Sequence, residues 1–243
     1  MPLTLSHPAA VLPLRRLGLP MTALVLGSMV LDVPLYLGSL RGYEITHNPL
    51  SIVTVDIALT LFALLVWFAV LRDPLVDLSP APIRSRLTPH ARLSRRQWLL
   101  AIPAGAIAAA THIFWDSFTH ADRWGYDRVT WLRTDHLGLS GLRWAQYGSA
   151  LIGLAVVISY AVVELRSLPA DDPRPPRALG TYALLGAFSV AAALGLLTVV
   201  TAIPDGLYAM AFHGVVISLI TLAVTVLAVC LAWHVHVRSH RDE

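Results

Sequence analysis

The sequence predicts an all-α fold, a polytopic membrane helical bundle with about six transmembrane helices. Hydrophobic residues make up 56% of the 243 residues and charged residues only 14%, whereas a soluble domain carries about 25% charged residues. The apolar runs are about 20 residues long, which is the length that a helix needs to cross a bilayer. They are too long and too continuously apolar for the alternating strands of a membrane barrel.

Six apolar runs are candidates for the spans, and polar or proline-rich breaks separate them. Asn48-Pro49 opens the second run with a helix cap and a proline at the first helical position. Proline-rich segments at 73–89 and 168–176 interrupt the helical pattern, and Pro204-Asp205-Gly206 predicts a tight turn. The predicted spans are 17–40, 50–71, 98–120, 146–165, 179–203 and 207–237.

Composition also limits the domain organisation and the class of partner. The length suits a single membrane-embedded domain, 1–243, with the motifs in 1–147 and additional spans in 148–243. A formal charge of +3 is too small to indicate binding to nucleic acid. The apolar composition makes membrane lipid the expected partner. With Cys230 as the single cysteine, neither an intrachain disulfide nor a thiolate metal site is expected.

The arginines predict the orientation of the bundle. With both termini cytoplasmic, the inner segments hold thirteen of the 18 basic residues, all of them arginine, and the outer loops hold five. The positive-inside rule favours this orientation. The alternative is that the first run is broken or re-entrant. In the predicted orientation, the segment 4–13 is expected on the inner side unless it inserts beside the bundle. This segment is apolar but carries two prolines.

The most informative stretch is the end of the third run, where His112, Asp116 and His120 follow one another at four-residue spacing. Four residues are about 400° of helix, so the three side chains share one stripe. Ionisable groups inside a membrane span are costly and indicate a function. Two imidazoles and a carboxylate suit a metal site. The alternative is a hydrogen-bonded stripe that faces a wet cavity and holds no metal.

Other spans place titratable groups at a similar depth. In the predicted topology Asp32, Asp56 and His213 lie at the level of His112, about 9–14 Å below the outer surface, with His47 just above. Each aspartate is a candidate ligand or proton carrier, or else a neutral hydrogen-bonded acid. His213 fits helix packing better than ligation.

Histidines outside the spans are weaker candidates. His136 follows Asp135 in an outer loop, where it could cap the site or be solvated. The remaining histidines are expected to be solvated in inner loops or the tail: His90, His234, His236 and His240.

Several short motifs together resemble a bacterial family of polytopic membrane proteins, number 4184 among the domains of unknown function. The resemblance is strong through about Tyr147, and a proline of the family pattern is replaced by Leu31 before Asp32. The motifs are Leu5-Ser6-His7-Pro8-Ala9-Ala10-Val11-Leu12-Pro13, Gly27-Ser28, Asp32, Thr46-His47 and His112 with Trp115-Asp116-Ser117-Phe118-Thr119-His120. The order of histidines and aspartates is also similar to putative membrane-bound metal-dependent hydrolases and to the zinc-dependent phospholipase C type.

These resemblances imply a ligand set, an activity and a location in the bacterial cell membrane. They place the N-terminal segment against the bundle. Nitrogen and oxygen ligands suit a divalent metal, zinc above all. The implied activity is hydrolysis of a phosphoester or lipid-like substrate, with Asp32 or Asp56 as a catalytic base. A transporter or ion-handling protein and a non-catalytic membrane protein remain alternatives. The implied ligands are His7, Asp32, His47, His112, Asp116 and His120.

Overall fold

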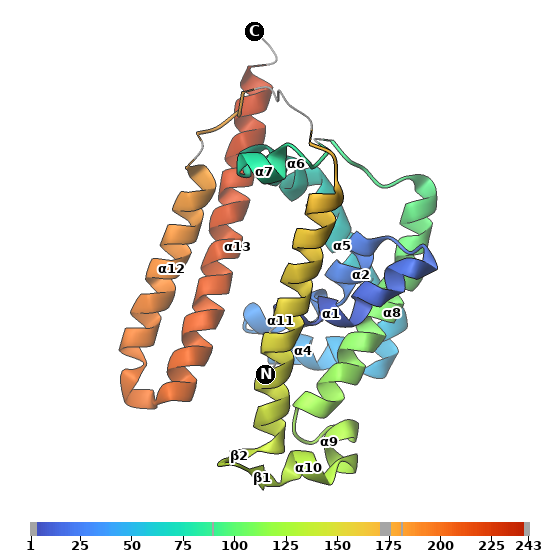
Figure 1. The fold of residues 1–243 in the computed structure, drawn as a ribbon, viewed down its shortest axis with the longest axis vertical. Coiled ribbons are helices and arrows are strands. Elements are labelled where there is room, and N and C mark those ends of the chain that lie inside the picture. The colour runs from blue at the N-terminus through green and yellow to red at the C-terminus, as the bar shows by residue number, and fades with distance from the viewer. Residues whose placement is uncertain (1–3, 89, 171–175, 181, 241–243) are drawn as a thin grey trace. The chain divides into compact units, whose positions relative to one another are not determined.

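The computed structural model describes residues 4–88, 90–170, 176–180 and 182–240, and over these residues the chain is almost entirely helical (Figure 1). Five helices are long and apolar enough to cross a membrane. The all-α membrane bundle is therefore confirmed. The five helices are Val55–Leu78, Arg95–Thr119, Gly141–Ser167, Ala183–Thr201 and Ala209–Ser239.

By its internal contacts the chain divides into two compact units. Unit 1 comprises Met1–Leu65 and Arg92–Glu164, and unit 2 comprises Val66–Ala91 and Leu165–Glu243. Each unit is described by itself below. The single membrane-embedded domain stays a prediction.

Unit 1 combines a set of short helices with the long helices α8 and α11. The elements are η1 (Thr4–Ser6), α1 (Pro8–Val11), η2 (Leu12–Leu17), α2 (Met21–Gly27), η3 (Val30–Asp32), α3 (Val33–Tyr36), α4 (Leu40–Thr46), η4 (Pro49–Val53), α5 (Val55–Val66), α8 (Arg95–Thr119), α9 (Trp124–Arg128), α10 (Thr130–Arg133), β1 (Asp135–His136), β2 (Leu139–Ser140) and α11 (Gly141–Ser167).

The first predicted span is not one helix. α2 ends at Gly27, a short 3-10 turn follows, and α3 ends before Gly38, whose φ of +76° is left-handed. The apolar stretch Met21–Tyr36 is shorter than the five spanning helices. Pro34 cannot donate a backbone hydrogen bond within the run. A continuous span over 17–40 was therefore wrong, and the break leaves carbonyl groups free for side chains.

Small residues let α2 approach α8 closely. A side chain on Gly27 would place its Cβ 3.0 Å from the Cβ of Ala108 and 3.2 Å from the Cα of Gly105. Such close approach between helices requires small residues at the contact. The capping box of Ser94 and Gln97 fixes the start of α8. Close packing thus fixes the position of the α8 stripe relative to the end of α2.

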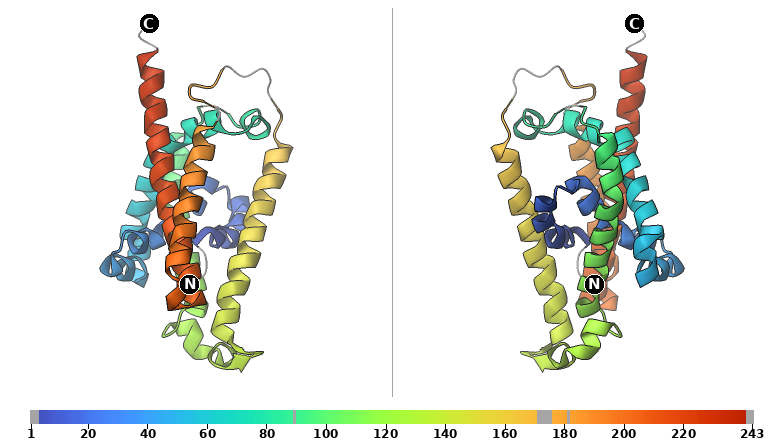
Figure 2. Two further views of the ribbon diagram at one scale, coloured as in Figure 1. Left: turned by 90° about the vertical axis from the view of Figure 1, so that its left-hand side faces the viewer. Right: turned by 90° about the vertical axis from the view of Figure 1, so that its right-hand side faces the viewer.

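The N-terminal segment packs beside the middle of α11 (Figure 2). A Cβ on Gly153 would lie 2.7 Å from the Cβ of Ser6, so this glycine permits the contact. Segment 4–13 was expected on the inner side unless it inserted beside the bundle, and the structure shows this insertion, as the family resemblance implied. The prediction of a cytoplasmic N-terminus assumed that the first run is a complete span, and the structure breaks that run. The cytoplasmic C-terminus stays a prediction.

Unit 2 is a helical hairpin together with the segment that follows α5. Its elements are the π-helix η5 (Trp67–Leu71), α6 (Arg72–Leu78), α7 (Ala81–Arg84), α12 (Ala183–Thr201), η6 (Ile203–Asp205) and α13 (Leu207–Ser239). α12 and α13 lie side by side. Their connection through Pro204-Asp205 and Gly206, with φ of +89°, confirms the predicted tight turn.

The second spanning helix continues past its predicted end at 71, through a proline. Pro74 has no N–H to donate to the carbonyl of Val70, and a π-helical turn precedes it. The His234 ring bonds this carbonyl instead, with 3.0 Å between Nε2 and the oxygen. His234 is half-buried, so the expectation that it is solvated was wrong.

Candidate metal centre

The structure brings the histidines and aspartates of the implied ligand set into one buried cluster within unit 1. The residues of the cluster come from four separate stretches of the sequence. The helix breaks after α2 and at the ends of η3, α4 and α8 let the side chains of the cluster point toward one another. The members are His7 between η1 and α1, Asp32 at the end of η3, His47 after α4, His112 and Asp116 on α8, and His120 after α8.

Backbone carbonyls fix the orientation of two imidazole rings in this cluster. His47 Nδ1 lies 2.9 Å from the carbonyl oxygen of Tyr43, and His112 Nδ1 lies 2.8 Å from that of Ser28. A carbonyl only accepts, so in the neutral rings Nδ1 carries the proton and Nε2 a lone pair. The two Nε2 atoms face each other at 3.2 Å. Two lone pairs at this distance repel unless a proton or a metal ion lies between them.

Two carboxylates complete a set of four donor atoms. Asp32 Oδ1 lies 3.6 Å from the Nε2 atoms of both His47 and His112. Asp116 Oδ2 lies 3.5 Å from the same two atoms. A tetrahedral zinc site with metal–ligand bonds of about 2.0–2.2 Å separates its ligands by about 3.3–3.6 Å. The observed distances therefore have the size that tetrahedral ligation requires, and all four donors lie within 4.8 Å of one another.

The hydrogen bonds of Asp32 leave its inward oxygen without a partner. Thr4 Oγ1 donates to Asp32 Oδ2 at 2.5 Å, whereas Asp32 Oδ1 is buried and has no hydrogen-bond partner among the described residues. Thr4 also bonds the Tyr36 hydroxyl at 2.6 Å. A buried anionic oxygen without a donor is costly. Its position beside two imidazole lone pairs is the arrangement that a bound cation would satisfy.

His7 and His120 border the four-atom group through Asp116. His7 Nε2 lies 3.5 Å from Asp116 Oδ1 and its ring stacks on His112 at 3.8 Å between centroids. His120 Nδ1 lies 3.4 Å from Asp116 Oδ2, and its side chain is 17% exposed, the most accessible of the cluster. Burial lowers the pKa of His7 to about 4 and also lowers the pKa of His120. Both rings are therefore neutral bases at pH 7.

The structure places Asp56 outside the four-atom group. Its side chain on α5 is fully buried and accepts a hydrogen bond from Ser51 Oγ at 2.7 Å through Oδ2. Oδ1 has no hydrogen-bond partner among the described residues. Its role as a catalytic base stays a prediction, as does that of Asp32.

Two further candidate histidines have other surroundings. His136, on β1, bonds Thr134 Oγ1 at 2.9 Å and stacks on Trp131 of α10. His213 is exposed on α13. Neither belongs to the metal-binding group found among the described residues.

The sequence analysis did not predict the supporting role of three residues: Thr4, Ser28 and Tyr43. The Tyr43 contact carries a local signal, because a histidine just after a helix can donate to the carbonyl four residues before it. The Ser28 and Thr4 contacts join residues 84 and 28 positions apart. No local pattern predicts contacts of that separation.

The fold and the cluster define a class of protein, an all-α membrane protein with a buried histidine and aspartate centre. The family of domain of unknown function DUF4184 matches residues 1–233, and the chain belongs to this family. The match extends well past Tyr147, where the sequence resemblance was strong. No curated protein and no solved structure matches the chain.

Proposed function

We propose that this protein binds a divalent metal ion, zinc in the first place, and hydrolyses a phosphoester or lipid-like substrate at the membrane. The observation that carries the proposal is the pair of Nε2 atoms of His47 and His112, 3.2 Å apart, with both Nδ1 protons committed to carbonyl groups. The proposed ligands are Asp32, His47, His112 and Asp116. A donor set of nitrogen and oxygen without thiolate suits zinc, and iron or manganese nearly as well.

The chemistry of a hydrolase follows from this donor set and its neighbours. Zinc held by Asp32, His47, His112 and Asp116 would supply a water molecule with a pKa near 7 and a positive charge to polarise a phosphoryl or carbonyl oxygen. The neutral rings of His7 and His120 stand beside Asp116, where each can accept a proton. His120 is the partly exposed member, so substrate is expected to approach from its side. Asp56 stays a candidate base if a water links it to the centre.

The alternative is transport of an ion. It is favoured by one observation, the fully buried Asp56 carboxylate whose Oδ1 has no partner among the described residues. Intramembrane carboxylates mark proton and ion paths in transporters. Unlike the hydrolase, a transporter would show pH-dependent flux in proteoliposomes that Asp56→Asn abolishes.

Elemental analysis of the purified full chain tests the metal. We expect about one metal ion per chain in the wild type and loss of at least nine-tenths of it in His112→Ala and Asp116→Ala, because truncation removes a direct ligand. His136→Ala is the matched control, because this histidine lies outside the cluster. Circular dichroism verifies that each variant keeps its helices. A folded wild type that takes up no metal on dialysis against zinc would contradict the proposal.

Hydrolysis is tested separately on the metal-loaded protein. Release of nitrophenol from bis(4-nitrophenyl) phosphate and from 4-nitrophenyl acetate should be faster than with the His112→Ala variant by at least tenfold. Stoichiometric metal with no turnover of either probe, together with ion flux, would support transport instead.

A further inference from the structure

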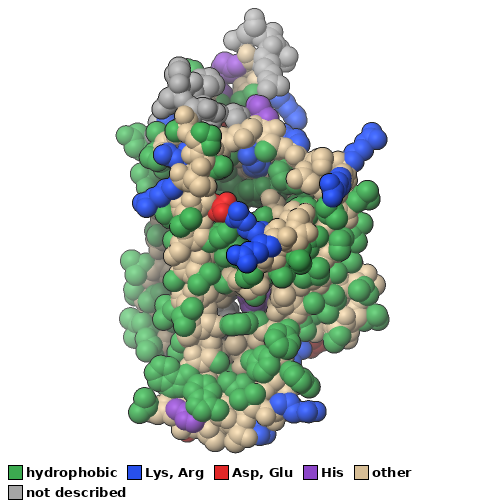
Figure 3. Space-filling model, turned by 45° about the vertical axis from the view of Figure 1, so that its right-hand side comes forward, with side chains coloured by type: hydrophobic (Ala, Val, Ile, Leu, Met, Phe, Trp, Pro, Cys, Tyr) green, Lys and Arg blue, Asp and Glu red, His purple; other side chains and the backbone are tan. Residues whose placement is uncertain are grey.

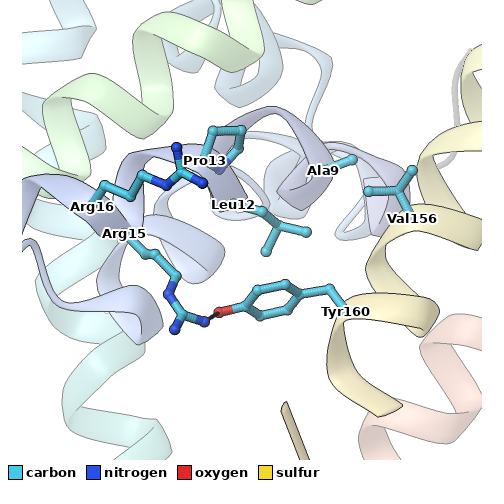
Figure 4. A pocket seen from close by; sticks show the side chains of 7 residues that line it. All are labelled: Ala9, Leu12, Pro13, Arg15, Arg16, Val156 and Tyr160. Carbon is cyan, nitrogen blue, oxygen red and sulfur yellow. Dashed lines mark hydrogen bonds between the residues drawn. The ribbon is translucent and has the colours of Figure 1, made fainter. Parts of the chain in front are cut away.

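A cavity lies in unit 1 between η2 and α11, away from the four-atom group (Figure 4). Its volume is about 520 Å³, within the range of small-molecule sites. Two adjacent arginines, Arg15 and Arg16, extend from η2, and Tyr160 extends from α11 toward Arg15. The rest of the lining is apolar. The lining residues are Ala9, Leu12, Pro13, Arg15, Arg16, Val156 and Tyr160.

The side chains that line this cavity carry positive charge without an equal number of negative groups. Arg15 Nη1 donates to the Tyr160 hydroxyl at 2.7 Å and forms an ion pair with Glu164. The guanidinium of Arg16 is exposed and has no hydrogen-bond or ion-pair partner within the described part of the chain. The lining therefore carries two guanidinium groups, of which Arg15 has the Glu164 carboxylate beside it. Basic side chains gather beside an acidic one in the middle of a largely hydrophobic face (Figure 3).

The position of the cavity along α11 indicates which kind of ligand could neutralise its excess positive charge. Tyr160 lies seven residues before the end of α11 at Ser167, which is about 10 Å along the helix axis. α11 is long and apolar enough to cross a membrane, and no residue of its apolar window is buried within the described chain, as expected of a helix that faces lipid. A cation at the boundary between acyl chains and head groups is stabilised by lipid phosphates.

We propose that this cavity binds an anionic phospholipid, with its phosphate at Arg16 and Arg15 and an acyl chain along Leu12 and Val156. Guanidinium groups bind phosphate oxygens through paired N–H donors, and the Tyr160 hydroxyl offers a further hydrogen bond. The apolar walls suit a hydrocarbon chain, whereas free phosphate would leave them exposed to water.

The cavity is linked to the metal centre through the chain. Ala9, which lines the cavity, follows His7 by two residues, and both lie on the inserted N-terminal segment. That the bound lipid is also the substrate rests on the proposed hydrolase function. Lipid binding itself requires only the arginines and the apolar walls.

Native mass spectrometry of the delipidated full chain, titrated with phosphatidylglycerol or phosphatidylcholine, tests the proposal. We expect tighter binding of phosphatidylglycerol, and about fivefold weaker binding of it in Arg16→Gln, because a basic group near phosphate is worth about that factor. The matched control is Arg96→Gln, at an exposed position on α8 outside the cavity, which should bind as the wild type does.

A second variant should shift the affinity in the opposite direction. Glu164→Gln removes the carboxylate that competes for Arg15, so phosphatidylglycerol should bind several-fold more tightly. If the Arg15–Glu164 pair only stabilised the fold, breaking the pair would not strengthen lipid binding. Thermal melting in detergent verifies that the variant is folded.

Three outcomes would overturn the lipid site: no effect of Arg16→Gln, an equal effect of Arg96→Gln, or inorganic phosphate displacing the lipid at millimolar concentration. The His112→Ala variant separates this proposal from the proposed function, because it should bind lipid as the wild type does. Normal lipid binding by a protein that takes up no metal would reject the hydrolase alone. Metal uptake without selective lipid binding would reject the lipid site alone.

Discussion

His112 shows how one side chain depends on a distant break in the backbone. Its Nδ1 bonds the carbonyl of Ser28, just past the end of α2, and its Nε2 faces that of His47. A continuous first helix would have committed that carbonyl to an intrahelical bond. The four-residue spacing predicted that His112, Asp116 and His120 share a face, whereas the bond that sets the tautomer of His112 depends on tertiary structure.

The resemblance and the residue spacing contributed differently to the predicted ligands. Spacing alone indicated the α8 stripe, and depth in the predicted topology added Asp32. His7 came from the family resemblance, because arginine counting placed its segment on the other side. Arginine counting treated Arg15 and Arg16 as the start of a spanning helix, whereas in the structure they lie on the short helix η2, in a segment that packs beside α11.

Thr4→Val tests the support of Asp32. The valine keeps the shape of the side chain but cannot donate to Asp32 Oδ2, which now accepts this bond at 2.5 Å. Groups that orient a ligand through hydrogen bonds typically contribute 10–100-fold to metal affinity, so zinc affinity should fall by about 10–100-fold. Competition with a zinc-binding dye measures the change.

The control for this prediction is Thr198→Val. Thr198 is half-buried on α12, away from the metal centre in sequence, and donates to the carbonyl of Leu194 in its own helix. Its zinc affinity should equal that of the wild type. Unchanged affinity in Thr4→Val would show that Asp32 does not depend on this bond to hold a metal.

At the scale of elements, close contact between α2 and α8 positions the centre. Apolar length predicted five of the spans, because a run of this length in lipid has no alternative to a helix. The same criterion failed for 17–40, where Pro34 and the left-handed Gly38 interrupt the run. Local breakers within an apolar run were visible in the sequence, but only the packed structure shows that the resulting turns carry Asp32 and the Ser28 carbonyl.

Gly27→Ala tests the close approach of these helices. The added Cβ would lie 3.0 Å from the Cβ of Ala108, so one helix must shift. Overpacking of this kind costs about 1–3 kcal/mol, and the midpoint of thermal unfolding in detergent should fall. Zinc affinity should fall as well, because the Ser28 carbonyl moves relative to His112.

Gly148→Ala is the matched control for the helix substitution. A Cβ on Gly148 in α11 would meet no atom within 4 Å. Alanine is favoured over glycine in a helix by about 1 kcal/mol, so this variant should be as stable as the wild type or more stable. An equal loss of stability in both variants would contradict the close-packing argument.

At the scale of the whole molecule, the number of spanning helices determines which loops share a side. Three of them, α11, α12 and α13, separate the hairpin at Leu137 from Ser239, and if all three cross the membrane, we expect these two positions on opposite sides of it. From the excess of arginine in the predicted inner segments we predict that Ser239 lies in the cytoplasm. The centre on the last turns of α8 then lies toward the outer side, since α8 ends shortly before the hairpin.

Labelling of single cysteines in intact cells tests this orientation. Leu137 is 95% exposed and Ser239 is exposed, whereas the native Cys230 is buried and should react little. Leu137→Cys should react with a membrane-impermeant maleimide before lysis, and Ser239→Cys only after permeabilisation. The unsubstituted chain gives the background from Cys230. The reverse pattern would turn the centre toward the cytoplasm, and reaction of both positions in intact cells would contradict the odd number of spans between them.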